Sequence, residues 1–183
     1  VYIIIATGRE YGITKKIAHT LGLNTPIICY QGALIYNPQT DEILDSKELP
    51  LSLVDQLIDF SRLHNLSLHL YLHDKAYTEC PTALCSIIFL DTGTPVVEVS
   101  DLKKVITSLP IKGLIVHPPE KIHTMIEKLR MSLGPDSNIF RSVDTLIEIT
   151  SPDASKGHAL ATLAAYYEIP QAEVMAMGDQ DND

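Results

Sequence analysis

The sequence predicts an α/β protein in which a Rossmann-like parallel sheet is interrupted by an inserted α+β region. Residues 1–6 form a continuous apolar run, as expected for a strand covered on both faces. A second apolar run, residues 26–30, follows a helical pattern, so the chain opens as a strand–helix–strand unit with parallel strands and a right-handed crossover. The α/β pattern of helix and buried strand returns from Ser151, whereas the middle of the chain alternates apolar and polar residues.

The two flanking segments each carry a predicted helix. In the first, apolar residues recur at helical spacing and a glycine follows to end the helix: Ile13, Ile17, Leu21 and Gly22. Residues 34–44 predict a hairpin because two apolar stretches flank a turn-rich segment. In the second, residues 156–167 predict a helix and residues 174–177 a short buried strand.

The middle of the chain is predicted to form a domain of its own, inserted into the sheet domain. The boundaries that follow are residues 46–148 for the insertion, and residues 1–45 together with 149–183 for the sheet domain. Alternation over residues 66–72 predicts a strand with one solvent-facing side, which would leave His69 and His73 at the surface. The other predicted elements are strands at 76–78, 87–90, 96–99 and 114–116, helices beginning near 49 and 122, and a hairpin over 138–149.

Composition limits the classes of partner. The 183 residues are 45% hydrophobic, enough for a core, and carry a net charge of −9 without a basic patch, which argues against a nucleic-acid partner. No apolar run approaches the ~20 residues of a membrane span. Three scattered cysteines, Cys29, Cys80 and Cys85, lack metal-ligand spacing and predict reduced thiols in a cytoplasmic protein. Nothing in the sequence indicates an oligomeric state.

Three polar segments follow predicted strands or begin a helix. Thr7-Gly8-Arg9 comes directly after the first strand, where a hydroxyl and backbone N–H groups can bind an anion. Lys156 stands in the first turn of a helix, against the helix dipole, and there it favours a bound phosphate. The segment 178–183 places three carboxylates after the last strand, which a hard divalent cation would neutralise.

Each of these segments also has an ordinary structural interpretation: a common turn, a solvated lysine and a solvated acidic loop. All three segments are expected at the edge of a parallel sheet where ligands bind, and this shared position favours a functional interpretation over the structural ones. Together they supply donors, a fixed positive charge and metal-binding carboxylates, the groups that hold a phosphoryl group and its metal ion.

Four segments in this order resemble the Cof-type branch (subfamily IIB) of the haloacid dehalogenase superfamily, and the resemblance covers nearly the whole chain. They are residues 3–9, residues 26–33, Ser155-Lys156-Gly157 and residues 178–183. The resemblance implies a Mg²⁺-dependent phosphatase acting on small phosphorylated metabolites, most simply sugar phosphates. It also implies that the insertion is a cap of the C2B type, with a β-sheet and two helices, which closes over the site.

The resemblance also implies a role for each matching residue. Thr7 and Gly8 would bind phosphoryl oxygens, and Lys156 would neutralise the phosphate and the attacking carboxylate. Asp179 would ligate Mg²⁺, Asn182 would hold the phosphate, and Asp183 would orient Lys156 or the metal's water shell. Substrate contacts from Arg9 and Gln31 are weaker expectations, since this branch usually carries Asn at the position of Gln31.

The family's nucleophile lies in an Asp-x-Asp segment near the N-terminus, and no such segment precedes Thr7. The chain begins inside an apolar run and stops directly after another, so we expect it to be truncated at both ends and inactive as printed. The stretch between Cys80 and Thr94 also looks short for a cap. A phosphomutase of the same superfamily and a non-catalytic phosphate-binding module remain alternatives, because fold alone does not fix function.

Overall fold

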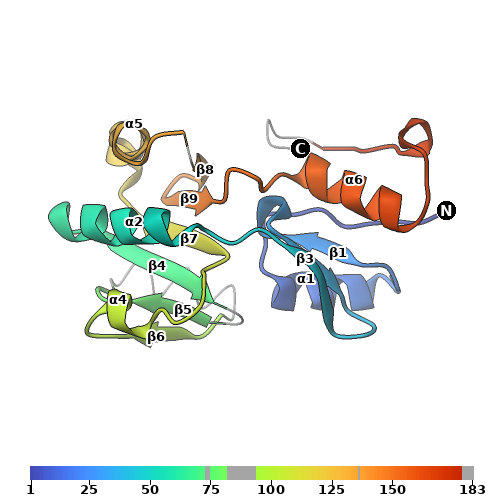
Figure 1. Cartoon of the computed structure of the whole chain (residues 1–183), viewed down its shortest axis with the longest axis horizontal. Helices are drawn as coiled ribbons and strands as arrows, with labels where there is room; N and C mark the ends of the chain where they lie inside the picture. The colour runs from blue at the N-terminus through green and yellow to red at the C-terminus, as the bar shows by residue number, and fades with distance from the viewer. Residues whose placement is uncertain (73–74, 82–93, 136, 179–183) are drawn as a thin grey trace. The chain divides into compact units, whose positions relative to one another are not determined.

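The computed structural model describes residues 1–72, 75–81, 94–135 and 137–178, and the predicted strand at 87–90 lies outside these ranges. The chain divides into two compact units, drawn in Figure 1. Unit 1 comprises Val1–Lys47 and Asp153–Asp183, and unit 2 comprises Glu48–Pro152. Unit 1 is therefore built from two separate stretches of chain, and unit 2 from one continuous stretch.

Unit 1 contains a three-stranded antiparallel sheet with the order β1-β2-β3. Its strands are β1 (Ile27–Cys29), β2 (Leu34–Asn37) and β3 (Glu42–Ser46), so the predicted hairpin is confirmed. Ahead of this sheet, Ala6 forms a parallel bridge with Ile28. The predicted parallel alignment of the first two apolar runs is thus confirmed at this bridge.

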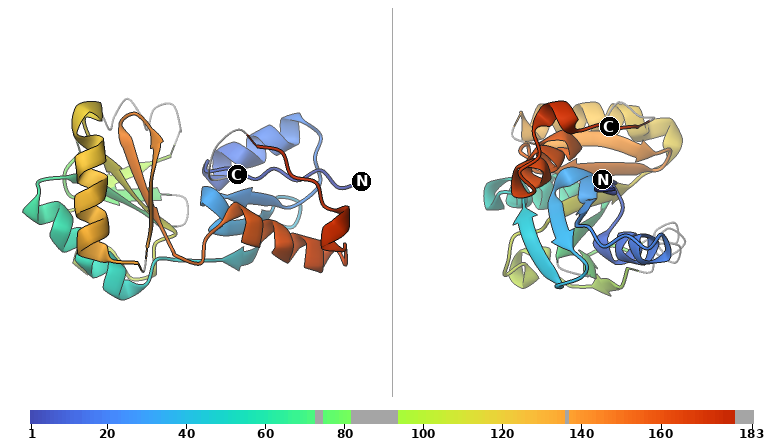
Figure 2. Two further views of the ribbon diagram at one scale, coloured as in Figure 1. Left: turned by 90° about the horizontal axis from the view of Figure 1, so that it is seen from above. Right: turned by 90° about the vertical axis from the view of Figure 1, so that its right-hand side faces the viewer.

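Helices α1 (Tyr11–Thr20) and α6 (Lys156–Tyr166) cover opposite faces of this sheet, as Figures 1 and 2 show. α6 packs Ala159 and Leu163 against Ile28 and Ile35. Two short 3₁₀ turns complete the unit, η1 (Tyr30–Gly32) and η3 (Gln171–Glu173).

The inward face of α1 differs from the prediction. Thr14 and Ala18 are the buried residues of this helix, both at 0% exposure, whereas Ile17 and Leu21 are exposed. The face of α1 that packs on the sheet is therefore offset by about one residue from the face that carries the apolar stripe. Small side chains of the helix lie against the sheet. The Thr14 hydroxyl is accommodated there because it donates to the Glu10 carbonyl oxygen at 2.8 Å.

Neither terminal apolar run is a strand, so both predictions of a buried strand are wrong. Val1, Tyr2 and Ile3 are exposed, and so are Met175 and Met177. Residues 1–6 are hydrogen-bonded on the β1 side alone, and no described strand pairs with residues 174–177. An apolar run is buried only where neighbours cover it, and the run itself does not specify those neighbours.

Unit 2 is built on a six-stranded sheet with the order β6-β5-β4-β7-β9-β8. All neighbouring strands are antiparallel except β5 and β6, which are parallel. The strands are β4 (Ser67–Leu72), β5 (Lys75–Thr78), β6 (Val96–Glu98), β7 (Lys112–Val116), β8 (Asn138–Val143) and β9 (Leu146–Thr150). The helical elements are α2 (Leu51–Leu63), α4 (Leu102–Val105), the turn η2 (Pro119–Lys121) and α5 (Ile122–Leu133).

Helices α2 and α5 supply the main core of unit 2. Their apolar stripes pack with side chains of the sheet in one cluster, which includes Leu57, Leu129, Ile115 and Ile149. Gly113 lets α2 approach β7 closely, because a Cβ there would lie 2.8 Å from the Leu57 side chain. The helices predicted to begin near residues 49 and 122 are confirmed. None of the helices in the described ranges is long and apolar enough to cross a membrane.

The prediction that one side of β4 faces solvent is wrong, because all six residues of this strand are buried. His69 is 0% exposed and is not a surface histidine, while His73 lies outside the described residues. On the same side of the sheet the Lys112 ammonium lies 4.7 Å from the centre of the Tyr71 ring and 3.6 Å from Glu148 Oε2. Alternation marks the polar side of a strand correctly here, yet that side is a buried polar layer.

Candidate functional site

The Thr7–Gly8 turn follows the parallel bridge of unit 1 and is fastened to β1. Thr7 N–H donates to the Ile28 carbonyl at 2.9 Å, and Arg9 N–H donates to Thr7 Oγ1 at 3.2 Å. The hydroxyl oxygen therefore accepts from within the turn and keeps its own proton to donate elsewhere. Gly8 N–H donates to no acceptor among the described residues. The turn thus presents two donors, one hydroxyl and one amide, of the kind that bind an anion.

The chain leaving β1 is bent back beside this turn by three successive left-handed residues. Tyr30, Gln31 and Gly32 have φ values of 50°, 61° and 93°. Left-handed backbone costs a non-glycine residue roughly 1–2 kcal/mol. Two hydrogen bonds hold the conformation, from Tyr30 N–H to the Arg9 carbonyl and from Gln31 N–H to the Thr7 carbonyl, each 3.1 Å long.

Two glycines then allow three segments of unit 1 to approach one another. A Cβ on Gly8 would lie 2.7 Å from Gln31 Cδ, so the Gln31 amide rests directly on the turn. A Cβ on Gly32 would meet the backbone of Ser155 and would lie 2.6 Å from Lys156 N. The exit from β1 is therefore in direct contact with the turn through Gly8 and with the start of α6 through Gly32.

Lys156 is the first residue of α6, as predicted. Ser155 caps the helix with extended dihedrals, and its Oγ accepts the His158 N–H at 3.0 Å. The remaining amides of the first turn carry the positive end of the helix dipole, which favours a bound anion. A lysine at this position adds a full charge to the same end of the helix.

Two ionisable groups next to this cluster, Cys29 and Tyr30, are buried and neutral. Cys29 is 0% exposed, and burial raises the pKa of its thiol to about 12. Burial and the nearby Glu10 carboxylate together raise the pKa of the Tyr30 phenol well above its ordinary value. A thiolate is the nucleophilic form of cysteine, so the buried thiol of Cys29 has no nucleophilic role here.

The structure brings together Thr7, Gly8, Gln31 and Lys156, with Arg9 exposed on the same turn. The three remaining predicted site residues, Asp179, Asn182 and Asp183, lie outside the described residues. Sequence reasoning gave no role to Gly32 or to Ser155. A serine just before a helix is a recognisable cap; the close approach at Gly32 has no signal in the local sequence.

Metal binding is predicted only for residues beyond residue 178. Within the ranges that the structure describes, no group of three or more His, Cys, Asp or Glu side chains could hold a metal ion. The described part of the site therefore consists of donors and a cation, which suit an anionic group.

An α/β fold that brings a hydroxyl donor, an amide donor and a helix N-terminus beginning with a lysine to one end of a sheet is an arrangement that suits a phosphoryl-binding enzyme. The chain belongs to the haloacid dehalogenase-like hydrolases, whose family model matches residues 1–183. The resemblance to this superfamily and its Cof-type branch is thereby confirmed, as are the α/β fold class and the enzyme class of haloacid dehalogenase-type phosphatase.

Individual relatives agree with this placement. The chain is 25% identical to the 5-amino-6-(5-phospho-D-ribitylamino)uracil phosphatase of Bacillus subtilis, over 100% of the chain and 68% of that protein. A haloacid dehalogenase-like hydrolase from Bacteroides thetaiotaomicron superposes with a TM-score of 0.89 at 25% identity, over 100% of the chain and 70% of that structure. A subclass IIB sugar phosphatase shares the fold, with a TM-score of 0.79 at 18% identity, over 100% of the chain and 69% of that structure.

Proposed function

We propose that the protein is a Mg²⁺-dependent phosphatase of small phosphorylated metabolites, with sugar phosphates as the first class to test. The reaction would pass through an aspartyl-phosphate, with the nucleophile supplied by a segment outside residues 1–183. One observation carries the proposal. The contacts at Gly8 and Gly32 unite the Thr7 turn with the N-terminus of α6, where Lys156 stands.

The described residues account for binding of the phosphoryl group. The Thr7 hydroxyl and the Gly8 N–H would donate to its oxygens, since neither donor is used within the described chain. The Lys156 ammonium and the first turn of α6 would offset the charge of the phosphate and of the attacking carboxylate. Fixed donors act strongly on phosphoryl transfer because positioning and charge neutralisation supply most of its catalysis.

The metal part of the proposal rests on the sequence alone. Asp179 and Asp183 would hold Mg²⁺ through carboxylate oxygens, the ligands this ion prefers, and Asn182 would bind the phosphate. The bound ion would neutralise negative charge on the phosphoryl oxygens. Arg9 and Gln31 remain proposed substrate contacts, and Gln31 is supported by its position against Gly8.

The substrate class is proposed from the relatives and from the role expected of unit 2. One relative is named for a phosphorylated ribityl compound and a structural neighbour for sugar phosphates. Unit 2 has the sheet and two main helices expected of a cap, and in this proposal it closes over the site and selects the substrate. A cytoplasmic location, with neither nucleic acid nor membrane as partner, completes the proposal.

The test is phosphate release by the full-length protein from a panel of phosphorylated metabolites, with and without Mg²⁺. We expect Lys156→Met to lower kcat about 10²–10³-fold, the usual effect of removing one charge-stabilising donor. Lys16→Met is the matched control, because Lys16 is an exposed lysine of α1 outside the site, and it should retain activity. Asp179→Ala should abolish the stimulation by Mg²⁺.

Three outcomes would contradict the proposal: no turnover across the panel, turnover indifferent to Mg²⁺, or equal activities of the two lysine variants. Transfer of the phosphoryl group to a second metabolite in place of water would identify a phosphomutase. Tight phosphate binding without turnover would identify a non-catalytic module.

A further inference from the structure

Unit 2 contains a cavity that the proposed phosphatase chemistry does not use. Its volume is about 200 Å³ and it lies between α2, the start of β4 and α4. Its floor is formed by four buried aliphatic side chains, those of Ile58, Leu66, Leu68 and Leu102. The floor is therefore a surface for an apolar group.

The size of the cavity indicates the size of its occupant. An apolar cavity of about 150 Å³ in a protein core admits benzene and stays free of water. The cavity in unit 2 is somewhat larger and is open at its rim. It has room for a six-membered ring with one small substituent.

One polar group within the cavity lacks a partner. Ser61 is 4% exposed and lines the cavity, and its Oγ makes no hydrogen bond. A serine inside a helix usually donates to the carbonyl four residues earlier, and Ser61 does not. A buried hydroxyl without a partner lowers stability, so a ligand that supplies a partner would be favoured.

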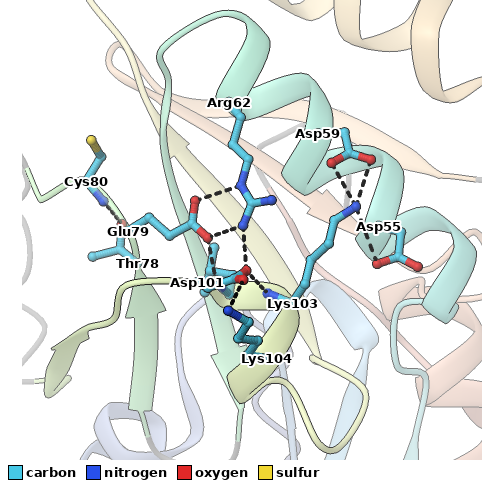
Figure 3. Close-up of polar contacts among 10 residues, drawn as sticks. Asp55, Asp59, Arg62, Thr78, Glu79, Cys80, Asp101, Lys103 and Lys104 are labelled. Carbon is cyan, nitrogen blue, oxygen red and sulfur yellow. Dashed lines mark hydrogen bonds and ion pairs between the residues drawn. The ribbon is translucent and has the colours of Figure 1, made fainter.

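The charged residues at the rim are already paired, as Figure 3 shows. Arg62 Nε and Nη2 donate to the Glu79 carboxylate at 3.0 and 2.6 Å, and Nη2 also donates to Asp101 Oδ1 at 2.7 Å. Glu79 Oε1 accepts the Leu102 N–H at 2.6 Å. The two charged residues that line the cavity, Arg62 and Glu79, carry opposite charges and pair with each other, so together they offer no net charge to an ionic ligand.

We propose that this cavity binds a small neutral ring compound that carries a single hydroxyl group, of the size of phenol. The ring lies on the aliphatic floor and the hydroxyl forms a hydrogen bond with Ser61 Oγ. Charged metabolites and polyhydroxylated sugars are excluded, because the floor is aliphatic and Ser61 is the one buried polar group without a partner among the described lining residues. The site is independent of the proposed phosphatase reaction.

Phenol is titrated into the isotope-labelled full-length protein, and amide chemical shifts are followed by NMR. Benzene, which lacks the hydroxyl group, is titrated in the same way for comparison. We expect phenol to shift the amides of residues 58–68 and to bind about three- to tenfold more tightly than benzene. Ser61→Ala should remove this preference and leave benzene binding unchanged. Ser52→Ala is the matched control, since Ser52 is an exposed serine of the same helix, and it should keep the preference.

Two results would overturn the proposal. One is the absence of shifts in residues 58–68 at millimolar phenol. The other is the same phenol-to-benzene ratio in the wild type and in Ser61→Ala. Ser61→Leu adds a check on location, because the larger side chain fills the cavity. A folded Ser61→Leu protein that still binds phenol would place phenol elsewhere and would also overturn the proposal.

Discussion

The polar clusters of the two units are built in opposite ways. In unit 2, Arg62 donates hydrogen bonds to both Glu79 and Asp101, and Asp101 also caps α4 by accepting the Lys103 N–H. Further along the same surface the Lys103 ammonium is 2.7 Å from Asp59 (Figure 3). These side chains form hydrogen bonds with each other and hold α4 against α2.

In unit 1 the backbone, and not pairing between charged side chains, holds the polar cluster in place. Glycines and left-handed residues fix the Thr7 turn beside α6, and the donors of the turn remain available. Charges that pair with each other stabilise an element, whereas donors fixed by backbone geometry are available to a ligand. Three changes test this difference.

The largest effect is expected for Gly32→Ala. Its Cβ would collide with the backbone of Ser155 and Lys156, and backbone cannot move aside as a flexible side chain can. A displacement of the helix end by about 1 Å can cost about 10²-fold in rate, so we expect phosphate release to fall by at least about that factor.

Gly22→Ala is the control for this change. Gly22 also has a positive φ, 68°, yet nothing lies within 4 Å of a Cβ there. It should cost about 1 kcal/mol of unfolding free energy with unchanged kcat. Equal loss of activity in both variants would show that backbone strain, and not the approach of the helix, is what matters.

An intermediate effect is expected for Gly8→Ala, because the three atoms nearest to a Cβ there belong to the side chain of Gln31, which can move aside more readily than backbone. We expect kcat to fall about tenfold and to recover partly in the double variant Gly8→Ala/Gln31→Ala. Phosphate-release kinetics of the two single variants and the double variant complete a cycle. Strictly additive effects would mean that the two residues do not act through their contact.

The smallest effect is expected for Arg62→Ala, measured by urea unfolding. Arg62 holds two partly exposed carboxylates, so its removal should cost about 1–2 kcal/mol with little change in activity. Lys104→Ala is the control: this side chain is 81% exposed and makes a single contact with Asp101 at 3.4 Å, so its loss should cost under about 0.5 kcal/mol.

Lowering the pH should reduce the difference in unfolding free energy between the wild type and Arg62→Ala. Hydrogen bonds from Arg62 lower the pKa of Glu79 below its ordinary 4.5 and the pKa of Asp101 below its ordinary 3.8. A lowered pKa contributes stability above the ordinary value and loses that contribution as pH falls through the folded value. Between pH 7 and 3 the wild type should therefore lose more stability than Arg62→Ala, and equal losses would contradict this assignment.

Sequence reasoning succeeded where one face of an element determines its position. The stripe Leu53, Val54, Leu57 and Ile58 is fully buried in α2, and the start of α6 at Lys156 is as predicted. Such patterns depend on residues close together in the chain.

The failures share a different cause. Burial of His69, exposure of Met175 and the inward face of α1 all depend on which segments lie opposite, and those segments are distant in sequence. The same limit applies to the site. Thr7 and Lys156 could be proposed from their local surroundings, but Gly32, which joins their segments, acts through contact with a helix that lies on the far side of the insertion in the sequence.

That contact also orders the assembly of the molecule during synthesis. Unit 2 is continuous in sequence and is complete before α6 leaves the ribosome, whereas unit 1 needs its second stretch. Closing a loop of this length is entropically costly unless the intervening chain has already collapsed. The folded insertion shortens the effective loop between Gly32 and Ser155. Docking of α6 onto the first stretch is then expected to be a late step in folding, so the end of the sheet proposed to bind phosphate forms last.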